Sequence, residues 1–561
     1  MSFLSRVFAP RYVAVWLPTA GMAIMLAALR MDAAAPSMAA AALIAAACVF
    51  TIGVHDVLQK KHAVLRNYPV FGRFRFMLER IRPELRQYFF EGEHDGQPFS
   101  RTKRALVYQR AKGALDTRPF GTQLDVYAEG YEWMNHSMQP APICNSDFRV
   151  SIGGPLCLQP YDASLLNISA MSYGALSAAA VRALNAGAKG GRFAHDTGEG
   201  GVSAHHLVAG GDLIWEIGSG YFGCRGVDGG FDAEKFSSVA CNAQIKMVEI
   251  KLSQGAKPGH GGMLPASKVT PEIAAIRGIP VARDCISPAA HAAFTTPFGL
   301  LDFIARLRQL SHGKPVGFKL CIGQKLEFMA IVKAMVETGI LPDFIVVDGN
   351  EGGTGAAPAE FADNLGTPLR EGLNFVNACL IAAGLRENIK LGCAGKIITG
   401  FDMACAIALG ADWCNMARGF MFALGCIQAQ ACHTGRCPTG VATQDTDRQR
   451  AIHIPTKAER VTRFHAETLK AFAELIGACG ISSPREIDAH HISRRTAGGE
   501  IMTLARLYPV PAQRAFLMGL APQELQALWN EASGTSFSRS PGGKPHREAV
   551  VELSTVANGA T

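Results

Sequence analysis

Three cysteines in one short stretch are the residues of this chain best suited to chemistry. Cys426, Cys432 and Cys437 lie at separations of six and five residues, and Pro438 follows the last of them. Thiolates are the usual ligands of iron–sulfur clusters, and a proline directly after the last cysteine is common in cluster loops. Three ligands suggest a three-iron cluster, or a four-iron cluster with one open corner. The alternative is three buried free thiols. Zinc is disfavoured, because a structural site needs four ligands and His433 directly adjoins Cys432.

Composition places the chain among large proteins that contain some membrane-embedded sequence. Of its 561 residues, 48% are hydrophobic and 18% are charged, which fits a large buried core together with apolar segments. The net charge of +8 is concentrated near the N-terminus. No aromatic-basic platform accompanies it, so the charge indicates membrane topology and no nucleic-acid partner. The 15 cysteines form no paired framework, which favours a reducing compartment and argues against disulfides.

Two uncharged stretches near the N-terminus predict a membrane anchor over residues 1–56. Residues 12–29 and residues 37–54 contain no charged side chain, and their length is at the short end for a span of about 20 residues. Arg30, Asp32 and Pro36 lie between them and suit a tight turn, so we expect a transmembrane helical hairpin. The alternatives are a signal peptide cleaved near residues 33–35 and followed by one span, or a buried helical pair in a soluble protein.

Basic residues after the second stretch set the predicted topology. Lys60, Lys61, Arg66, Arg73 and Arg75 follow it closely, and positive residues stay on the cytoplasmic side of a membrane. We therefore expect the protein in the inner (cytoplasmic) membrane, with the bulk of the chain in the cytoplasm.

Two further segments flank the central part of the chain. Residues 57–150 form a basic and aromatic N-terminal extension, in which residues 74–90 are predicted to be amphipathic and to lie either at the membrane surface or packed on the neighbouring domain. Residues 481–533 have a helical pattern. Residues 534–561 are polar and rich in Gly, Pro and Ser, a composition that is typical of a disordered tail.

From about residue 160 the pattern predicts an α/β fold of the (β/α)8 type, a TIM barrel. Short apolar runs alternate there with amphipathic stretches and Gly-rich loops. The candidate strands are Leu165–Ile168, Phe193–Asp196, Lys246–Ile250, Ile279–Val281, Val316–Leu320, Phe344–Asp348, Ile389–Gly392 and Trp413–Met416. A doubly wound sheet is the alternative. Its one nucleotide-type match, Gly218–Gly223, follows residues 212–217, which do not form a clean strand pattern, so we interpret it as a chance match.

Chemistry in such a barrel sits on the loops that follow the strands. Gly-rich turns after the late strands let backbone N–H groups approach a phosphate, and Lys396 and Arg418 would add charge-assisted contacts. A salt bridge on the barrel rim is the alternative role for Arg418. Lys319 lies inside a candidate strand, and a buried Lys is costly unless it is paired or functional.

The amino-acid sequence of these segments resembles that of the FMN domain of the glutamate synthases. Cys-His-Thr-Gly-Arg-Cys-Pro-Thr-Gly-Val-Ala-Thr-Gln (432–444) resembles the cluster loop of that family, and the likeness extends over roughly residues 150–480. The resemblance implies an FMN-binding barrel over residues 151–480 with an iron–sulfur loop at 425–440. It implies a 3Fe–4S cluster on Cys426, Cys432 and Cys437. It also implies reduction of 2-iminoglutarate, formed from 2-oxoglutarate and ammonia, to L-glutamate.

The same resemblance assigns the site residues. The residues implied to bind FMN are Met171, Ser172, Tyr173, Thr197, Lys319, Gly352, Gly353, Thr354, Gly395, Lys396 and Arg418. Those implied to bind the oxoacid are Gln254, Gly255, Lys257 and His260. Lys319 matches a family lysine beside the flavin and the oxoacid, where its ammonium would hold a carboxylate or steer protonation.

Two departures from the family limit what the resemblance implies. Large members have Glu where this chain has His260, a change that affects ammonia entry, proton delivery or substrate choice, or is neutral. We also expect no glutaminase domain and no FAD or NADPH domain. Ammonia would then come from solution or a separate subunit, and electrons from ferredoxin, an NAD(P)H-oxidising subunit or a membrane redox carrier.

Two other functions remain open at this point. One is a related flavoenzyme that makes an N-alkylated amino acid from another amine. The other is a membrane electron-transfer subunit whose flavin and cluster act without an oxoacid.

Overall fold

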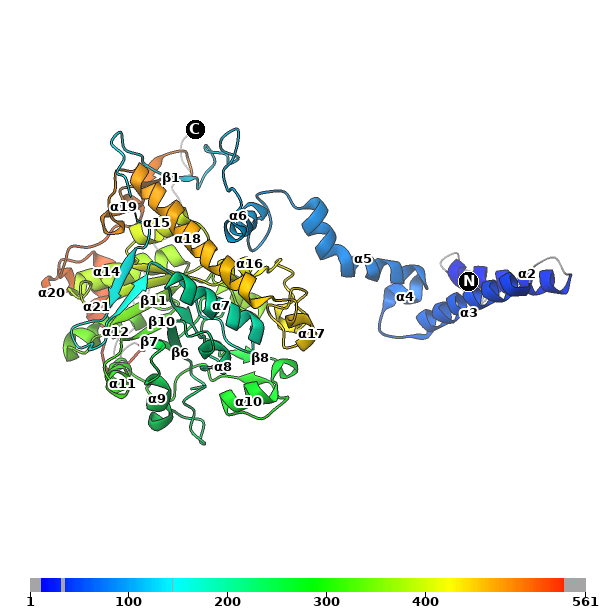
Figure 1. Cartoon of the computed structure of the whole chain (residues 1–561), viewed down its shortest axis with the longest axis horizontal. Coiled ribbons are helices and arrows are strands. Elements are labelled where there is room, and N and C mark those ends of the chain that lie inside the picture. The colour runs from blue at the N-terminus through cyan, green and yellow to red at the C-terminus, as the bar shows by residue number, and fades with distance from the viewer. Residues whose placement is uncertain (1–11, 32–35, 144, 539–561) are drawn as a thin grey trace, which may run out of the picture. The chain divides into compact units, whose positions relative to one another are not determined.

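The computed structural model describes residues 12–31, 36–143 and 145–538 of the chain. It divides into two compact units, one that ends at Arg101 and one that begins at Thr102. In Figure 1 the N-terminal unit is blue, and the larger unit runs from blue at α6 (Arg101–Lys112) through cyan, green and yellow to red.

The N-terminal unit begins with two long apolar helices, α2 (Val13–Arg30) and α3 (Pro36–Leu58). Both are long and apolar enough to cross a membrane by length and composition. They pack on each other where a Cβ at Gly53 would lie 2.9 Å from Cγ2 of Val15. The predicted pair of helices is thus present, and its membrane location stays a prediction. The predicted turn, and the alternative cleavage site at residues 33–35, lie largely outside the described residues.

An aspartate at the end of α3 fixes the direction of the chain that follows. The side chain of Asp56 is fully buried, accepts a hydrogen bond from the backbone N–H of Val70 at 3.1 Å and pairs with Arg73 at 2.6 Å. These contacts join α3 to the start of α5 (Phe71–Leu85). The helix α4 (Ala63–Asn67) lies between α3 and α5 in the chain, and the π-helical turn η2 (Arg86–Phe90) follows α5. The segment predicted to be amphipathic is therefore helical, and its apolar residues Phe74 and Ile81 are exposed.

A closed barrel of eight parallel strands forms the centre of the larger unit, as predicted. Its order around the barrel is given by β4 (Leu166–Ile168), β5 (His195–Asp196), β6 (Leu213–Ile217), β7 (Ile245–Lys251), β10 (Val316–Leu320), β11 (Phe344–Asp348), β12 (Lys390–Ala394) and β13 (Trp413–Met416). Helices surround it in Figure 1, among them α7 (Ala178–Gly191), α9 (Ala233–Ala240), α11 (Pro297–Leu310), α12 (Lys325–Thr338), α14 (Leu369–Ala383) and α15 (Gly400–Ala408).

One predicted strand is wrong. Residues 279–281 lie between α10 (Pro271–Arg277) and β9 (Cys285–Ile286), outside the barrel, and β9 pairs only with the short β8 (Met263–Leu264). The barrel strand missed by the pattern is β6, where Glu216 interrupts an apolar run although every residue is buried. The match at 218–223 does follow a strand. That strand belongs to a closed barrel, however, and the next helix begins only at Ala233, so no dinucleotide-binding turn is formed.

The N-terminal ends of the barrel strands are closed by apolar side chains. A hairpin of β2 (Arg149–Ile152) and β3 (Tyr161–Ser164) contributes to this cluster. Its members are Val150, Ile152, Tyr161, Ala163, Ala194, Ile214, Met247, Phe344, Val346 and Trp413. This apolar cluster fills the end of the barrel at which the strands begin. Polar chemistry is therefore confined to the opposite end, at the C-terminal ends of the strands.

The last part of the chain packs against the outside of the barrel. α18 (Ile454–Ala478) lies along α7, and β14 (Ile492–Arg495) pairs with β15 (Ile501–Thr503) and with β1 (Glu132–Met134). The prediction of helices alone for 481–533 is therefore incomplete. It holds for α19 (Leu504–Leu507), α20 (Ala515–Met518) and α21 (Gln523–Glu531). It fails for β14, whose partner β1 is remote in sequence. Most of the tail predicted to be disordered, residues 539–561, lies outside the described residues.

Candidate active site

The loops after β7 and β11 are joined into one wall at the barrel mouth. The backbone N–H of Gly255 donates to Oδ2 of Asp348 at 2.8 Å, and Nε2 of Gln254 donates to the carbonyl of Gly353 at 3.3 Å. Nζ of Lys257 donates to the carbonyl of Ala356 at 3.0 Å. A Cβ at position 255 would lie 1.8 Å from the carbonyl oxygen of Gly349, so only glycine permits this approach. The residues predicted to bind the oxoacid thus border those predicted to bind FMN.

The loops after β4 and β5 are also in close contact. Gly198 has a φ of +64°, and a Cβ there would lie 2.6 Å from the backbone nitrogen of Ser172. Met171 and Thr197 are buried beside it. Tyr173 points toward α10, because its hydroxyl donates to Glu272 at 2.6 Å. The backbone of residues 171–173 therefore lies at the mouth, while the Tyr173 hydroxyl is engaged elsewhere.

The late loops bring the predicted phosphate-binding residues together. Arg418, which opens α16 (Arg418–Leu424), donates from Nη2 to the carbonyl of Thr354 at 2.5 Å. A Cβ at Gly353 would lie 2.8 Å from Nε of Arg418, and Gly352 precedes it in the same turn. Gly395 and the exposed Lys396 follow β12. No ion pair among the described residues involves Arg418, so the alternative of a rim salt bridge finds no support. A cation beside glycine backbone fits a phosphate.

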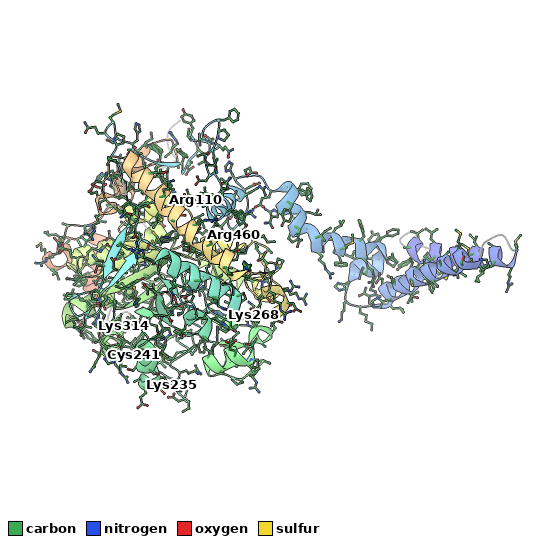
Figure 2. All side chains as sticks on the ribbon, viewed as in Figure 1. Arg110, Lys235, Cys241, Lys268, Lys314 and Arg460 are labelled. Atoms are coloured by element: carbon green, nitrogen blue, oxygen red, sulfur yellow. The ribbon has the colours of Figure 1, made fainter. Side chains whose placement is uncertain are left out.

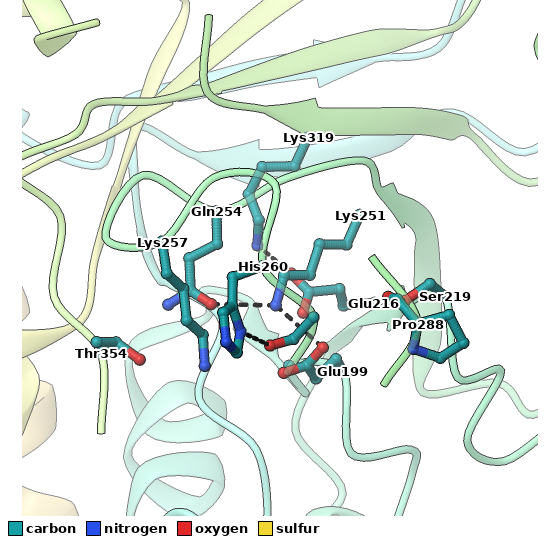
Figure 3. A network of polar contacts seen from close by, with 12 residues as sticks. Glu199, Glu216, Ser219, Lys251, Gln254, Lys257, His260, Pro288, Lys319 and Thr354 are labelled. Carbon is teal, nitrogen blue, oxygen red and sulfur yellow. Dashed lines mark hydrogen bonds and ion pairs between the residues drawn. The ribbon is translucent and has the colours of Figure 1, made fainter. Parts of the chain in front are cut away.

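Lys319 lies deep in the mouth among carboxylates. Its side chain is 5% exposed, forms an ion pair with Glu216, and forms another with Oε1 of Glu249 at 3.0 Å. Oxygen atoms of Asp196, Glu216 and Glu249 all lie within 4.8 Å of one another. Glu216 and Glu249 are direct partners in the pairing of β6 with β7. Figure 3 shows Lys319 directed toward Glu216.

Burial and charge act together on this group, which we call the lysine–carboxylate cage (Asp196, Glu216, Glu249 and Lys319). Burial, with the neighbouring carboxylates, raises the pKa of Asp196 well above its ordinary value. Burial raises the pKa of Glu249 to about 7, although Lys319 works against this. Burial by itself lowers the pKa of Lys319, but Glu216 and Glu249 outweigh it and raise the pKa. Lys319 is therefore a charged, paired lysine.

A second lysine and a glutamate lie nearer the opening. Nζ of Lys251 pairs with Glu199 at 3.1 Å and donates to Oε1 of Gln254 at 3.1 Å, as Figure 3 shows. Burial opposes ionisation of Glu199, yet Lys251 and Lys257 hold its pKa below the ordinary value. His260 lies at the rim, where Nδ1 donates to the carbonyl of Gly261 at 2.7 Å and the ring meets Phe361 edge to face.

The three cysteines of the 425–440 loop share one region just after α16. Cys426 follows that helix, Cys432 opens the 3₁₀ turn η4 (Cys432–Thr434), and Cys437 is buried. Burial raises the pKa of Cys426 to about 11, and the other two thiols add to the effect. Burial also opposes ionisation of Cys437. Its pKa is nevertheless lowered, by the Thr439 hydroxyl and by backbone N–H groups of residues 439–442.

The three cysteine sulfurs are less tightly grouped than the carboxylate oxygens of the cage. Among the described residues, the only group of three His, Cys, Asp or Glu ligand atoms within 4.8 Å is that of the carboxylates in the cage. The three sulfurs of Cys426, Cys432 and Cys437 therefore do not all lie within 4.8 Å of one another. In a cluster each thiolate binds a different iron atom, so the ligands lie farther apart. The N–H groups directed at Cys437 stabilise a thiolate.

The cysteine loop is joined to the loop after β4. Nε2 of Gln444 donates to the carbonyls of Gly174 and Leu176 at 3.0 and 2.9 Å. Nζ of Lys268 donates to the carbonyl of Ala175 at 3.1 Å. Burial lowers the pKa of Lys268, and Cys432 and Cys437 act in the opposite direction, so its ammonium is near both thiols. The loop predicted to face the flavin and the loop predicted to bind the cluster are thus in contact.

Comparison with known proteins identifies the family. Residues 161–482 match the family model described as the conserved region in glutamate synthase. The chain belongs to the glutamate synthase family. This membership confirms the family predicted from the sequence and the class of enzyme, a glutamate synthase-like oxidoreductase.

Individual relatives agree with this assignment. The glutamate synthase large subunit-like protein YerD of Bacillus subtilis is 38% identical, over 81% of this chain and 94% of its own length. The archaeal glutamate synthase [NADPH] of Methanocaldococcus jannaschii is 34% identical, over 59% of this chain and 62% of its own length. The ferredoxin-dependent glutamate synthase of Cyanidium caldarium is 37% identical over 41% of this chain, but over 15% of its own length. The chain thus spans nearly all of the Bacillus relative and less than two thirds of the other two.

Solved structures show a more distant likeness. A flavocytochrome b2 mutant with benzoylformate aligns with a TM-score of 0.40 and 11% identity, covering 79% of this chain and 90% of its own. A likeness at this level carries no argument about the chemistry of the glutamate synthase-like site.

Sequence reasoning missed the carboxylates that surround Lys319. Asp196 lies directly before the predicted Thr197, and Glu249 lies within a predicted strand. Both share their strand face with apolar residues two positions earlier, Ala194 and Met247. A charged residue at an inward position of an otherwise apolar strand is the signal that could have found them. Glu199 and Lys251 were missed because their pairing depends on a tertiary contact between the loop after β5 and the end of β7.

We expect the burial of the Glu249 carboxyl group to make the stability of this glutamate synthase-like protein depend on pH. Its pKa rises from 4.5 in the unfolded chain to about 7 in the folded protein. The folded state therefore holds a proton that the unfolded chain has released. The free energy of unfolding should then fall as the pH rises through this window, because stability present below the lower value is lost as the upper one is passed.

Glu249→Gln lacks this titration. Its thermal unfolding midpoint should decline less than that of the wild type between about pH 5 and about pH 8. Glu459→Gln, an exposed change on α18, should keep the wild-type slope. An equal slope in Glu249→Gln and the wild type would show that Glu249 does not titrate in this window.

Proposed function

We propose that this protein reduces the imine of 2-oxoglutarate and ammonia to L-glutamate, with FMN and a 3Fe–4S cluster and with electrons from a separate donor. One observation carries the proposal. The loops of the family pattern meet at a single barrel mouth, and one of them contacts the three-thiol loop through Gln444 and Lys268. A flavin at the mouth and a cluster at the thiols would then be neighbours.

The residues present fit FMN. Arg418, Gly353 and Thr354 would hold its phosphate, since a guanidinium without a carboxylate partner lies against glycine backbone there. Lys396 adds exposed positive charge, and the backbone of Met171–Tyr173 would border the ring system. When bound, FMN supplies hydride chemistry, and the protein supplies orientation and charge.

Lys257 is the better candidate for the oxoacid carboxylate. Its ammonium is buried and donates to a carbonyl, and burial lowers its pKa, with Glu199 opposing. An incoming carboxylate would relieve that cost, since buried charges need partners. Lys319 already has two carboxylate partners. Of its two predicted roles, steering protonation therefore has more support than holding the substrate.

The mouth residues would act mainly by positioning. Gln254 would hold the substrate loop against the Gly353 turn, and Lys251 orients Gln254. The apolar cluster beneath the cage excludes water from the lower barrel. A dry, preorganised site strengthens charge contacts to the reacting groups.

A second candidate is a related enzyme that uses an amine larger than ammonia. The imidazole of His260, which meets the Phe361 ring at a centroid distance of 5.4 Å, stands where large family members have a carboxylate. An apolar rim of this kind suits an N-alkyl group. A pure electron-transfer subunit has no comparable support, because it requires no oxoacid loop.

The relatives of this chain differ in their electron donor. The printed names of relatives include both NADPH and ferredoxin. Cations gather beside the first cysteine: a Cβ at Gly425 would lie 2.9 Å from Nζ of Lys457. Burial, Arg460 and Lys112 together lower the pKa of Lys457, and Figure 2 labels Arg460 at this part of α18. An unneutralised positive surface favours an acidic carrier protein such as a ferredoxin.

Membrane attachment is proposed through α2 and α3. Both helices pass the test of length and apolarity, and the basic residues after α3 favour a cytoplasmic catalytic unit. We expect the expressed chain to stay in the membrane pellet after alkaline carbonate washing and to need detergent for release. Recovery in the carbonate supernatant would reject a membrane-spanning anchor.

The cluster assignment predicts the effect of one cysteine substitution. Cys432→Ser should abolish bound iron and the electron paramagnetic resonance signal of the cluster, while flavin and fold are retained. Cys479→Ser is the matched control, because Cys479 is also a half-buried free thiol but lies after α18. Unchanged iron in Cys432→Ser would reject the ligand assignment.

The central test is anaerobic reoxidation of the chemically reduced protein. We expect the flavin absorbance to return only when 2-oxoglutarate and ammonium are both present, with L-glutamate as product. Lys257→Met should raise the KM for 2-oxoglutarate by about tenfold or more, and Lys235→Met, at an exposed ion pair, should not.

The same assay separates the alternatives. Reoxidation with methylamine but not with ammonium would favour the second candidate. No flavin response to 2-oxoglutarate at all would reject both enzymes. With ferredoxin as donor, the rate should fall as ionic strength rises, since salt screens the contact between unlike charges.

A further inference from the structure

Reductive amination requires protons as well as electrons. A 2-oxoglutarate dianion, an ammonium ion, two electrons and two protons give a glutamate anion and water. A carrier that delivers electrons alone leaves both protons to be supplied by the protein. This requirement rests on the proposed function, and it raises the question of which buried groups hold protons near the barrel mouth.

The lysine–carboxylate cage is the group placed to do so. Asp196, Glu216 and Glu249 are each at most 1% exposed, and their oxygens lie within 4.8 Å of one another around the ammonium of Lys319. If all three were ionised, three negative charges would face one positive charge. Like charges in a buried site cannot all remain ionised, so such groups share protons.

Unpartnered atoms lead to the same conclusion. In the described part of the chain, Oε2 of Glu249 and Oδ2 of Asp196 are buried without a hydrogen-bond partner, and Oε1 of Glu249 has only its ion pair with Lys319. A buried anionic oxygen without a donor is costly, whereas a proton on it removes the charge and supplies a donor for a neighbouring oxygen. Lys319 by itself cannot satisfy the three carboxylates.

We propose that Asp196 and Glu249 hold protons beside the Lys319–Glu216 ion pair and form the internal proton store of the reducing site. Each donation breaks one carboxyl O–H bond, forms one N–H bond on the group that is being reduced at the barrel mouth, and leaves a carboxylate. The ammonium of Lys319 stabilises the new negative charge. Solvent protons that enter at the mouth then restore the carboxyl group.

The titration behaviour of the cage agrees with this role. Burial raises the pKa of Glu249 to about 7 and that of Asp196 well above its usual range. The pKa of Lys319 is raised, because Glu216 and Glu249 outweigh the effect of burial. The carboxyl group of Glu249 therefore exchanges its proton near neutral pH, Asp196 holds its proton more firmly than an ordinary aspartate, and the ammonium of Lys319 remains charged.

The lysine–carboxylate cage can exchange protons in only one direction, toward the barrel mouth. The residues two positions earlier on the same strand faces are the apolar Ala194, Ile214 and Met247, so the side of the cage that faces the N-terminal ends of the strands is closed. Toward the mouth lies Asp348, whose Oδ2 accepts from Gly255 in the proposed substrate loop. Burial raises the pKa of Asp348, with Lys319 and Lys251 opposing and Glu216 adding to the rise. These are the charged groups that face the cage from β5, β6, β7, β10 and β11.

A divalent cation is the competing occupant of the same carboxylates. The ammonium of Lys319 already lies among them and forms two ion pairs, which supplies the positive charge that a metal would otherwise bring. Proton sharing needs no further ligand.

Infrared difference spectroscopy on the full-length holoprotein in detergent tests the proposal. The oxidised wild type near neutral pH should show the C=O stretch of a protonated carboxyl group, which shifts in deuterium oxide and changes when dithionite reduces the protein. Glu249→Gln should lose this band. It should also slow flavin reduction by about a hundredfold and flatten the dependence of that rate on pH.

Three variants separate a proton role from a structural one. Glu327→Gln changes a carboxyl group on α12 whose pKa burial also raises, and it should keep the wild-type band and rate. Glu249→Asp should restore part of both. Glu216→Gln should alter the band if Glu249→Gln does not fold.

No 2-oxoglutarate or ammonium enters the spectroscopic measurement, so its outcome is separate from that of the glutamate assay. A redox-sensitive band in a protein that makes no glutamate would support the proton store and reject the proposed function. Absence of the band in the wild type between about pH 6 and about pH 8, or a wild-type band and pH profile in Glu249→Gln, would overturn the store.

Discussion

The ion pairing of Lys319 with Glu216 and Glu249 is the constraint on which the upper half of the barrel depends. One strand contributes the ammonium and two neighbouring strands contribute its partners. Removing either kind of partner would leave an uncompensated buried charge, which is strongly destabilising. The requirement for pairing therefore fixes which residue each of these strands directs into the barrel. It also sets the height at which the apolar core ends and polar chemistry begins.

Above this layer, close contacts between loops assemble the site. Gly198 and Gly255 are places where any larger residue would meet neighbouring backbone, so the loops after β4 and β5, and those after β7 and β11, meet without intervening side chains. The backbone groups of the mouth are thus held by rigid strands. A site fixed in this way can orient an oxoacid and a flavin with little loss of conformational entropy on binding.

The cysteine loop is coupled to this mouth by polar contacts. Gln444, which follows the three cysteines, and Lys268, which precedes α10, donate to carbonyls in the loop after β4. In a glutamate synthase-like enzyme this arrangement would place the one-electron and two-electron centres on either side of a single loop. The cations near Gly425 would lie on the side from which a carrier approaches.

The sequence by itself determined the family, the barrel and the local motifs, because these depend on spacing within one segment. The cysteines at 426, 432 and 437, the Gly352–Thr354 turn and seven of the eight barrel strands were all predicted from short stretches. Strand β6 was missed because Glu216 breaks the apolar pattern. Strands β14 and β15 were missed because β14 pairs with the remote β1. Only the tertiary structure decided that Lys319 faces Glu216 and Glu249, and that Lys251 faces Glu199. Such pairings arise when the barrel closes, since closure sets strands far apart in sequence at hydrogen-bonding distance and removes their charged side chains from water.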